Sequence, residues 1–264
     1  MSSPRLSYSM RSFAQVSCPE IHGKSGMKGC LLGSASLLSK QRINKTVQLS
    51  LIGGSLLDFE GDAIVNAANT GGVTGFGIDQ MVNRAAGDFE IKKARREFDG
   101  IPTGSAKSTP SFAHKKCRHI IHAVGPVYRL NALGDSLSEE EKDSLLSSAY
   151  RSAIEKSSEH GVKTIGFCLL SAGVFRGSKQ LDDIISIAIQ SIASAIDEGL
   201  APTLEEVSIF AYTGEEKSCL HRVFCELKRC GFFDGSKKSQ EHCCQCVQQK
   251  YTVNGLAIFY TVGL

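Results

Sequence analysis

The fold of this chain is decided by the stretch Asp62-Ala-Ile-Val-Asn-Ala-Ala-Asn-Thr-Gly-Gly-Val-Thr-Gly-Phe-Gly-Ile-Asp-Gln-Met-Val-Asn-Arg-Ala-Ala-Gly87. It begins with a short apolar run, residues 63–66, which has two β-branched members and predicts a buried strand. Four glycines then fall within seven positions, and from Ile78 the apolar residues recur at helical spacing. This order of strand, glycine loop and helix can bind an anion, because glycines let backbone N–H groups approach it and the helix start carries a positive dipole end.

The glycine loop also has a simpler interpretation. It can be a tight connection between strand and helix, since it matches neither the Walker nor the Rossmann pattern. Polar residues favour a ligand site, because Asn66 and Asn69 precede the glycines and Asp79 stands at the helix start. Asp79 can cap that helix, or it can face a ligand hydroxyl or a water at the mouth of the loop.

The rest of the chain alternates predicted strands with predicted helices. Strands are expected at 47–52, 63–66, 118–124, 162–170 and 206–212, and helices at 78–86, 90–97, 137–160, 181–198 and 217–229. The helix at 90–97 is basic, and we expect it to present a solvated face. Ser138 is expected as the N-cap of the long helix, and Gly161 is expected to end it. Strands separated by helices imply a mostly parallel sheet covered on both faces, with ligands bound beyond the carboxyl ends of the strands.

Four blocks of the sequence form a recognisable set: 62–69 with 77–79 and 83–87, then 103–109, 120–128 and 170–175. Together they resemble the macrodomain family, and within it the MacroD-type ADP-ribosyl hydrolases of ADP-ribose 1″-phosphate (Appr-1″-p) processing. They follow the family's order and separations over roughly residues 47–233. The resemblance implies a three-layer α/β/α macrodomain with a mixed, mostly parallel central sheet. It also implies a protein that binds ADP-ribose and hydrolyses it from mono-ADP-ribosylated proteins or from O-acyl-ADP-ribose.

The resemblance further implies the residues of the site. The loops at 75–77 and 171–177 would bind the diphosphate through backbone N–H groups, and Phe175 would pack beside the distal ribose, although a phenylalanine in such a loop can also simply cover the core. Asn69 would fix that ribose, and Asp79 would hold a water against the substrate's own phosphate. The expected ligand-binding residues are Ser55, Leu56, Ala67, Asn69, Gly75, Phe76, Gly77, Ile78, Asp79, Ser171, Ala172, Gly173, Val174 and Phe175, with Asn69 and Asp79 as the catalytic pair.

Several positions depart from the family pattern. Thr74 and Phe76 interrupt the glycine run, and Phe76 can narrow the channel. Ser55 stands where the family has a carboxylate for the adenine amino group, and a neutral acceptor is weaker by about 1 kcal/mol. Asn83 stands where some members carry a histidine, and an amide is neither acid nor base near neutral pH. A reader module that binds ADP-ribose without hydrolysing it therefore stays open, as does a domain whose pocket has decayed.

Composition excludes other classes of function. The chain has 264 residues, of which 42% are hydrophobic, and this suits one domain with appendages. The net charge of +3 shows no basic face for nucleic acid, and no stretch is long and apolar enough to cross a membrane. No metal or cofactor is expected. His119 and His122 lie on opposite faces of a strand, and His242-Cys-Cys-Gln-Cys246 lacks the second half of a zinc site.

Three parts are expected along the chain: an N-terminal extension at 1–45, a macrodomain at 46–233 and an appendage of unknown order at 234–264. The extension is rich in serine and holds a single acidic residue, Glu20. This bias is typical of mitochondrial or plastid presequences, but a plain tail without an address fits it equally. Scattered cysteines are typical of a reducing compartment, so we expect an intracellular protein, whether in an organelle, the cytoplasm or the nucleus.

Overall fold

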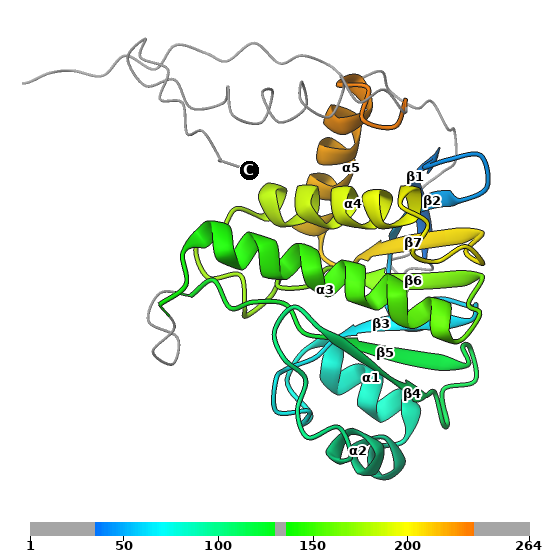
Figure 1. Cartoon of the computed structure of the whole chain (residues 1–264), viewed down its shortest axis with the longest axis vertical. Coiled ribbons are helices and arrows are strands. Elements are labelled where there is room, and N and C mark those ends of the chain that lie inside the picture. Colours follow the sequence, from blue (N-terminus) through cyan, green and yellow to red (C-terminus); the bar gives the residue numbers. More distant parts are fainter. Residues whose placement is uncertain (1–34, 130–135, 235–264) are drawn as a thin grey trace, which may run out of the picture. The chain divides into compact units, whose positions relative to one another are not determined.

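A computed structural model of the chain describes residues 35–129 and 136–234 (Figure 1). Its strands are β1 Ser36–Arg42, β2 Gln48–Gly53, β3 Ala63–Ala67, β4 Ala106–Pro110, β5 His119–Ala123, β6 Thr164–Cys168 and β7 Glu206–Ala211. Within the described residues they form one sheet in the order β1-β2-β7-β6-β3-β5-β4. The pairings inside the sheet are parallel and the pairing at each edge is antiparallel. The mixed, mostly parallel sheet is therefore confirmed.

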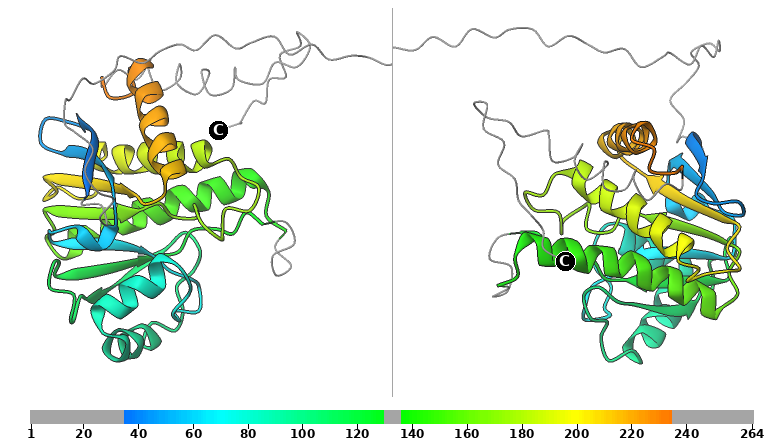
Figure 2. Two further views of the ribbon diagram at one scale, coloured as in Figure 1. Left: turned by 180° about the vertical axis from the view of Figure 1, so that it is seen from behind. Right: turned by 45° about the horizontal axis from the view of Figure 1, so that its top comes forward.

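Helices cover both faces of this sheet (Figure 2). They are α1 Ile78–Ala86, α2 Asp88–Arg96, α3 Glu139–Glu159, α4 Leu181–Asp197 and α5 Gly214–Arg229, with a short 3-10 turn, η1, at Leu56–Asp58. In one layer, α3 packs on α4 and α4 packs on α5. In the other layer, α1 and α2 pack on each other, and α1 contacts β3 while α2 contacts β4. Neighbouring residues of β3 point to opposite layers: Val65 pairs with Phe167, whose ring contacts Tyr150 of α3, and Asn66 bonds to Asp79 of α1. The three-layer α/β/α fold is confirmed.

The inner strands read as continuous apolar runs because both of their faces are buried. Ile64, Val65, Phe167 and Ile209 are all fully buried. Around this core, α3 begins and ends as the sequence predicts. The Ser138 side chain accepts from the backbone N–H of Glu141 in a capping box, and Gly161 follows the C-cap residue His160 with a φ of +59°.

Both edge strands were absent from the expected elements. β1 lies inside the range 1–45 that we expected to be an extension, yet it pairs along its length with β2, so the sheet begins by Ser36 and the expected boundary at residue 45 is too late. The side chains of β1 are mostly exposed or half-buried, so the strand lacks the strict alternation of a covered one. β4 ends in Pro110, a residue that sheets accept at an edge.

The last helix also begins earlier than expected, at Gly214 rather than Lys217. The reason is a second capping box, in which the Thr213 side chain accepts from the backbone N–H of Glu216. Among the described residues, no helix has both the length and the apolar composition needed to cross a bilayer. The predictions for 1–34, for the cluster at 242–246 and for the rest of 235–264 lie outside the described residues.

Candidate functional site

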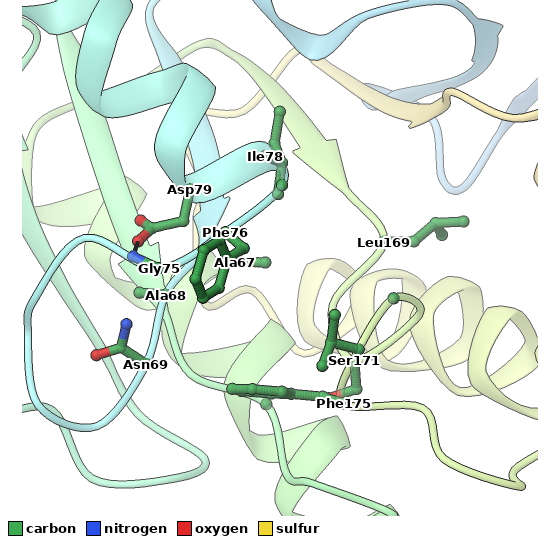
Figure 3. A pocket seen from close by; sticks show the side chains of 14 residues that line it. Ala67, Ala68, Asn69, Gly75, Phe76, Ile78, Asp79, Leu169, Ser171 and Phe175 are labelled. Carbon is green, nitrogen blue, oxygen red and sulfur yellow. Dashed lines mark hydrogen bonds between the residues drawn. The ribbon is translucent and has the colours of Figure 1, made fainter.

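A pocket with two adjoining lobes lies beyond the carboxyl ends of β2, β3, β6 and β7, where the fold class places ligands. The larger lobe has a volume of about 400 Å³ and the smaller about 240 Å³. The larger is lined by Ala67, Ala68, Asn69, Gly75, Phe76, Gly77, Ile78, Asp79, Gly125, Leu169, Ser171, Gly173, Val174 and Phe175 (Figure 3). The smaller is lined by Gly54, Ser55, Leu56, Gly77, Ile78, Met81, Cys168, Leu169, Gly173, Phe210, Tyr212 and Glu216. Of the expected ligand-binding residues, all but the buried Ala172 line one lobe or the other.

The first loop, residues 70–77, is tied to a buried arginine. Arg95 of α2 is 1% exposed, and its Nη1 lies 2.8 Å from Oδ1 of Asp79 and 3.1 Å from Oδ1 of Asn83. Its Nη2 donates to the carbonyl of Val73 at 3.1 Å. Lys93 and Arg96 are exposed, as expected of a solvated face, but the burial of Arg95 on the same helix was not expected. A usable signal was present, because Arg95 falls one turn after the fully buried Ile91 and so shares the apolar face of that helix.

Asp79 is the centre of this network and not a helix cap. The N-cap of α1 is Gly77, which makes no side-chain bond, whereas Asp79 is 2% exposed. Its Oδ2 accepts from the backbone N–H of Gly75 at 2.5 Å (Figure 3), and its Oδ1 also accepts from the side chain of Asn66 at 2.5 Å. The carboxylate thus joins the glycine loop to α2 and β3. Removing either partner of such a buried pair would leave the other without compensation for its lost hydration.

His122, to which the sequence analysis assigned no role, lies behind Asp79. A carboxylate only accepts hydrogen bonds, so Asn66 must present its amide nitrogen to Asp79. The same nitrogen lies 3.2 Å from Nδ1 of His122, so Nδ1 accepts and Nε2 carries the proton toward Oγ1 of Thr109, 3.1 Å away. Complete burial, and then the charge of Arg95, hold the pKa of His122 well below its usual value. The imidazole is therefore neutral and buried.

The remaining side chains of the first loop differ in their freedom. Asn69 donates from Nδ2 to the carbonyl of Val73 at 2.7 Å, which closes the loop on itself. Phe76 lines the larger lobe while 87% of its surface is exposed. Figure 3 shows it extending from the first loop, with Phe175 on the second. Phe76 leaves the lobe open in this conformation.

The second loop, residues 171–177, is held mainly through its backbone. Ser171 is buried with a φ of +56°, and its hydroxyl donates to the carbonyl of Pro126 at 2.7 Å. The backbone N–H of Tyr128 donates to the carbonyl of Phe175 at 2.7 Å. A Cβ on Gly125 would lie 2.3 Å from Oγ of Ser171, so this approach requires glycine.

The smaller lobe was recognised only in part from the sequence. Ser55 caps η1, where its hydroxyl oxygen accepts from the backbone N–H of Leu57 at 3.3 Å. Tyr212 and Glu216, which follow β7, were not expected to line the pocket. Their signal was their place at the end of the strand predicted at 206–212 and just beyond it, at the edge where the other two loops lie.

Comparison with known proteins supports these observations. The family model of the Macro domain matches residues 65–182. A macro domain-containing protein of Mesorhizobium japonicum, mll7730, is 34% identical over 168 residues, which are 64% of this chain and 88% of that protein. A second macro domain-containing protein, TTE0995 of Caldanaerobacter subterraneus, is 30% identical over a region that covers 69% of this chain and 98% of that protein. The chain belongs to the macro domain family.

Solved macrodomains share the architecture. The Oceanobacillus iheyensis macrodomain with ADP is 25% identical, and it superposes with a TM-score of 0.65 over 75% of this chain and 99% of the Oceanobacillus chain. The Trypanosoma brucei macrodomain in complex with ADP-ribose is 27% identical, with a TM-score of 0.57 over 67% and 68% of the two chains. The expected fold family is thereby confirmed.

In this macro domain the pocket has few reactive side chains. Cys168 lines the smaller lobe, but burial raises the pKa of its thiol to about 12, and its Sγ donates to the carbonyl of Val65 at 3.3 Å. It is therefore a protonated thiol and not a nucleophile. Within residues 35–129 and 136–234, no group of three or more His, Cys, Asp or Glu side chains is placed to hold a metal ion.

Proposed function

We propose that this macro domain binds ADP-ribose across the two lobes and, like the MacroD-type enzymes, hydrolyses it from mono-ADP-ribosylated proteins or from O-acyl-ADP-ribose. The observation that carries the proposal is the convergence of two glycine-bearing loops on one pocket. The supporting comparison is that relatives of the same fold are described with ADP and with ADP-ribose.

The diphosphate would lie between the two loops. Gly77 and Gly173 line both lobes, so a ligand that occupies both must pass them. A Cβ at either position would meet nothing within 4 Å, so the backbone there is open to a ligand. Helix α1 begins directly after Gly77, so the positive end of its dipole would also face the diphosphate.

Phe76 is compatible with this mode of binding. Solved variants of the Oceanobacillus macrodomain replace an asparagine, a glycine and an aspartate, at the same relative spacing as Asn69, Phe76 and Asp79 here. The variant with valine in place of the glycine was solved with ADP-ribose. We infer that a side chain at position 76 does not exclude the ligand and that the exposed ring of Phe76 would cover it.

Hydrolysis would depend on Asp79 and on the substrate itself. The polar side chains that line the larger lobe are Asn69, Asp79 and Ser171, and the Ser171 hydroxyl is already committed to Pro126. Oδ2 of Asp79 has a single hydrogen-bond donor among the described residues, the N–H of Gly75, and can accept another from a water or a ribose hydroxyl. The substrate's own phosphate would then complete the activation of that water, with positioning as the main contribution of the protein.

A reader module is the second candidate, and one observation favours it. Asn83, at the place of the family's histidine, donates to the backbone carbonyl of Asp79 at 2.5 Å. Asp79 is the one carboxylate lining the larger lobe, and most of its hydrogen-bonding capacity is used within the protein.

Calorimetric titration with ADP-ribose, paired with a release assay on a mono-ADP-ribosylated protein, tests the proposal. Asp79→Asn should cut the release rate on the order of 10²-fold, while the dissociation constant rises less. Asp79→Ala is a poorer test, because it also removes the oxygen that can still accept from Arg95 in the asparagine variant. Asn83→His tests whether an imidazole at this position speeds the release of ADP-ribose.

Tight binding of ADP-ribose without release by the unaltered protein would establish the reader module. If the unaltered protein does not bind ADP-ribose, both the hydrolase and the reader module are refuted.

A further inference from the structure

The smaller lobe contains a carboxylate with an unused oxygen. We propose that Glu216 determines which base this lobe accepts, by receiving a hydrogen bond from the 6-amino group of adenine. The proposal rests on the proposed function, since it assigns the nucleobase end of the same ligand.

The Glu216 side chain is fixed before any ligand arrives. Its Oε2 accepts from the backbone N–H of Tyr212 at 2.7 Å and from that of Thr213 at 2.9 Å. In return the Thr213 hydroxyl accepts from the backbone N–H of Glu216 at 3.1 Å. Among the described residues, Oε1 has no hydrogen-bond partner. A carboxylate held in this way has one free acceptor and loses little side-chain freedom when a ligand binds.

The surroundings of Glu216 fit a flat aromatic base. Tyr212, 66% exposed, lines the lobe with the apolar side chains of Leu56, Met81 and Phe210. Ser55 is uncharged and its oxygen already accepts from Leu57, so Glu216 is the carboxylate of this lobe. A carboxylate can only accept, and it therefore favours the amino group of adenine over the 6-oxo group of hypoxanthine or guanine.

Glu216→Gln separates this role from the role in capping. Glutamine also serves in capping boxes, so its single oxygen should stay with Tyr212 and Thr213, and its NH₂ group should then occupy the place of Oε1. The free acceptor becomes a donor while the helix start keeps its bonds. Glu141→Gln is the matched control, because Glu141 has the same position in the capping box of α3.

The experiment titrates ADP-ribose and its hypoxanthine analogue into the full chain and these two variants. The unaltered protein should bind ADP-ribose at least about ten-fold more tightly than the analogue, the effect expected when a hydrogen bond to a charged group is lost. In Glu216→Gln the preference should disappear or reverse, and in Glu141→Gln it should persist.

An unaltered protein that binds both compounds equally would overturn the proposal, whether or not the variant folds. An equal loss of affinity for both compounds in Glu216→Gln would also overturn it, because that result marks a purely structural role. If the unaltered protein binds neither compound, the proposed function itself is wrong.

Discussion

The two loops that enclose the pocket are anchored by different physical means. The first loop is tied to buried charges, because Arg95 bonds to the Val73 carbonyl and to Asp79, and Asp79 bonds to Gly75. The second is held by backbone hydrogen bonds, by the buried Ser171 hydroxyl, which donates to the Pro126 carbonyl, and by an exposed ion pair, in which Arg176 lies 3.1 Å from Glu215 of α5.

This difference shows where the domain is sensitive to substitution. Removing one partner of a buried ion pair costs about 3–5 kcal/mol, whereas an exposed pair contributes about 0–1 kcal/mol. The shape of the first loop is therefore coupled to the stability of the α1–α2 layer. The ion pair of the second loop can be lost with little effect on the rest of the domain.

The largest expected effect is that of Arg95→Met. The substitution keeps most of the side chain's volume but leaves Asp79 buried without its cation, so we expect a loss of about 3–5 kcal/mol in the free energy of unfolding. ADP-ribose affinity should fall with it, because the Val73 and Gly75 contacts share this network. Denaturant unfolding and calorimetry measure the two effects.

Two control variants test whether the loss of stability is specific to the buried arginine. Arg96→Met changes the exposed neighbour on the same helix, and Arg176→Met breaks the ion pair of the second loop; each should cost about 1 kcal/mol or less. If Arg95→Met is as stable as these controls, the buried pair does not anchor the first loop.

The next effect is a pH dependence that originates beneath the first loop. The pKa of His122 lies well below 6.5 in the folded protein, so below about pH 6.5 the unfolded chain binds a proton that the folded chain cannot. Stability should be greatest above this pH. As the pH falls from that value toward the lowered pKa, stability should decrease by up to about 1.4 kcal/mol per pH unit.

Urea unfolding at a series of pH values tests this dependence. His122→Gln should have a smaller slope between pH values of about 7 and 5 than the unaltered protein. The pKa values of His114 and His119 are also lowered by burial, and because both remain in the variant they set the background slope. An unchanged slope would mean that His122 is protonated as readily in the folded protein as in the unfolded chain.

The smallest effect on stability comes from alanine at the two ligand-facing glycines. Gly77 has a φ of +65°, so Gly77→Ala should cost about 1–2 kcal/mol, although no atom blocks its Cβ. Gly173 has no positive φ and no atom near its Cβ position. Gly173→Ala should therefore change the free energy of unfolding by no more than about 0.5 kcal/mol. Thermal unfolding of both variants checks the difference.

Glutamate at the same two positions tests binding rather than folding. Gly77→Glu and Gly173→Glu would each place a negative charge where the diphosphate is expected, and each should abolish ADP-ribose binding. If either variant titrates like the unaltered protein, its loop does not bind the diphosphate.

The residues that sequence reasoning located share one property, which is a local signal. Strand β3, the glycines and Ser138 are recognisable from their neighbours, and the family blocks add the second loop. The contacts of Arg95 and His122 lack such a signal, because their partners are distant in the chain, whereas Glu216 lies in a local capping box with Thr213. The burial of Arg95 follows from contacts 16 and 22 residues away, and that of His122 from a contact 56 residues away. Strand β1 was missed for a related reason, since an edge strand covers too little surface to impose a clear hydrophobic pattern.

Neither lobe of the pocket is lined by a lysine or an arginine among the described residues. A diphosphate bound there would meet uncharged N–H groups and a helix end at short range, so dissolved salt would have few ion pairs to screen. The affinity for ADP-ribose should therefore change little between about 50 and about 500 mM sodium chloride, whereas binding through several exposed cations weakens as salt screens them. Calorimetry over this range of ionic strength would measure it, and a steep decline would mean that a cation outside these two lobes reaches the ligand.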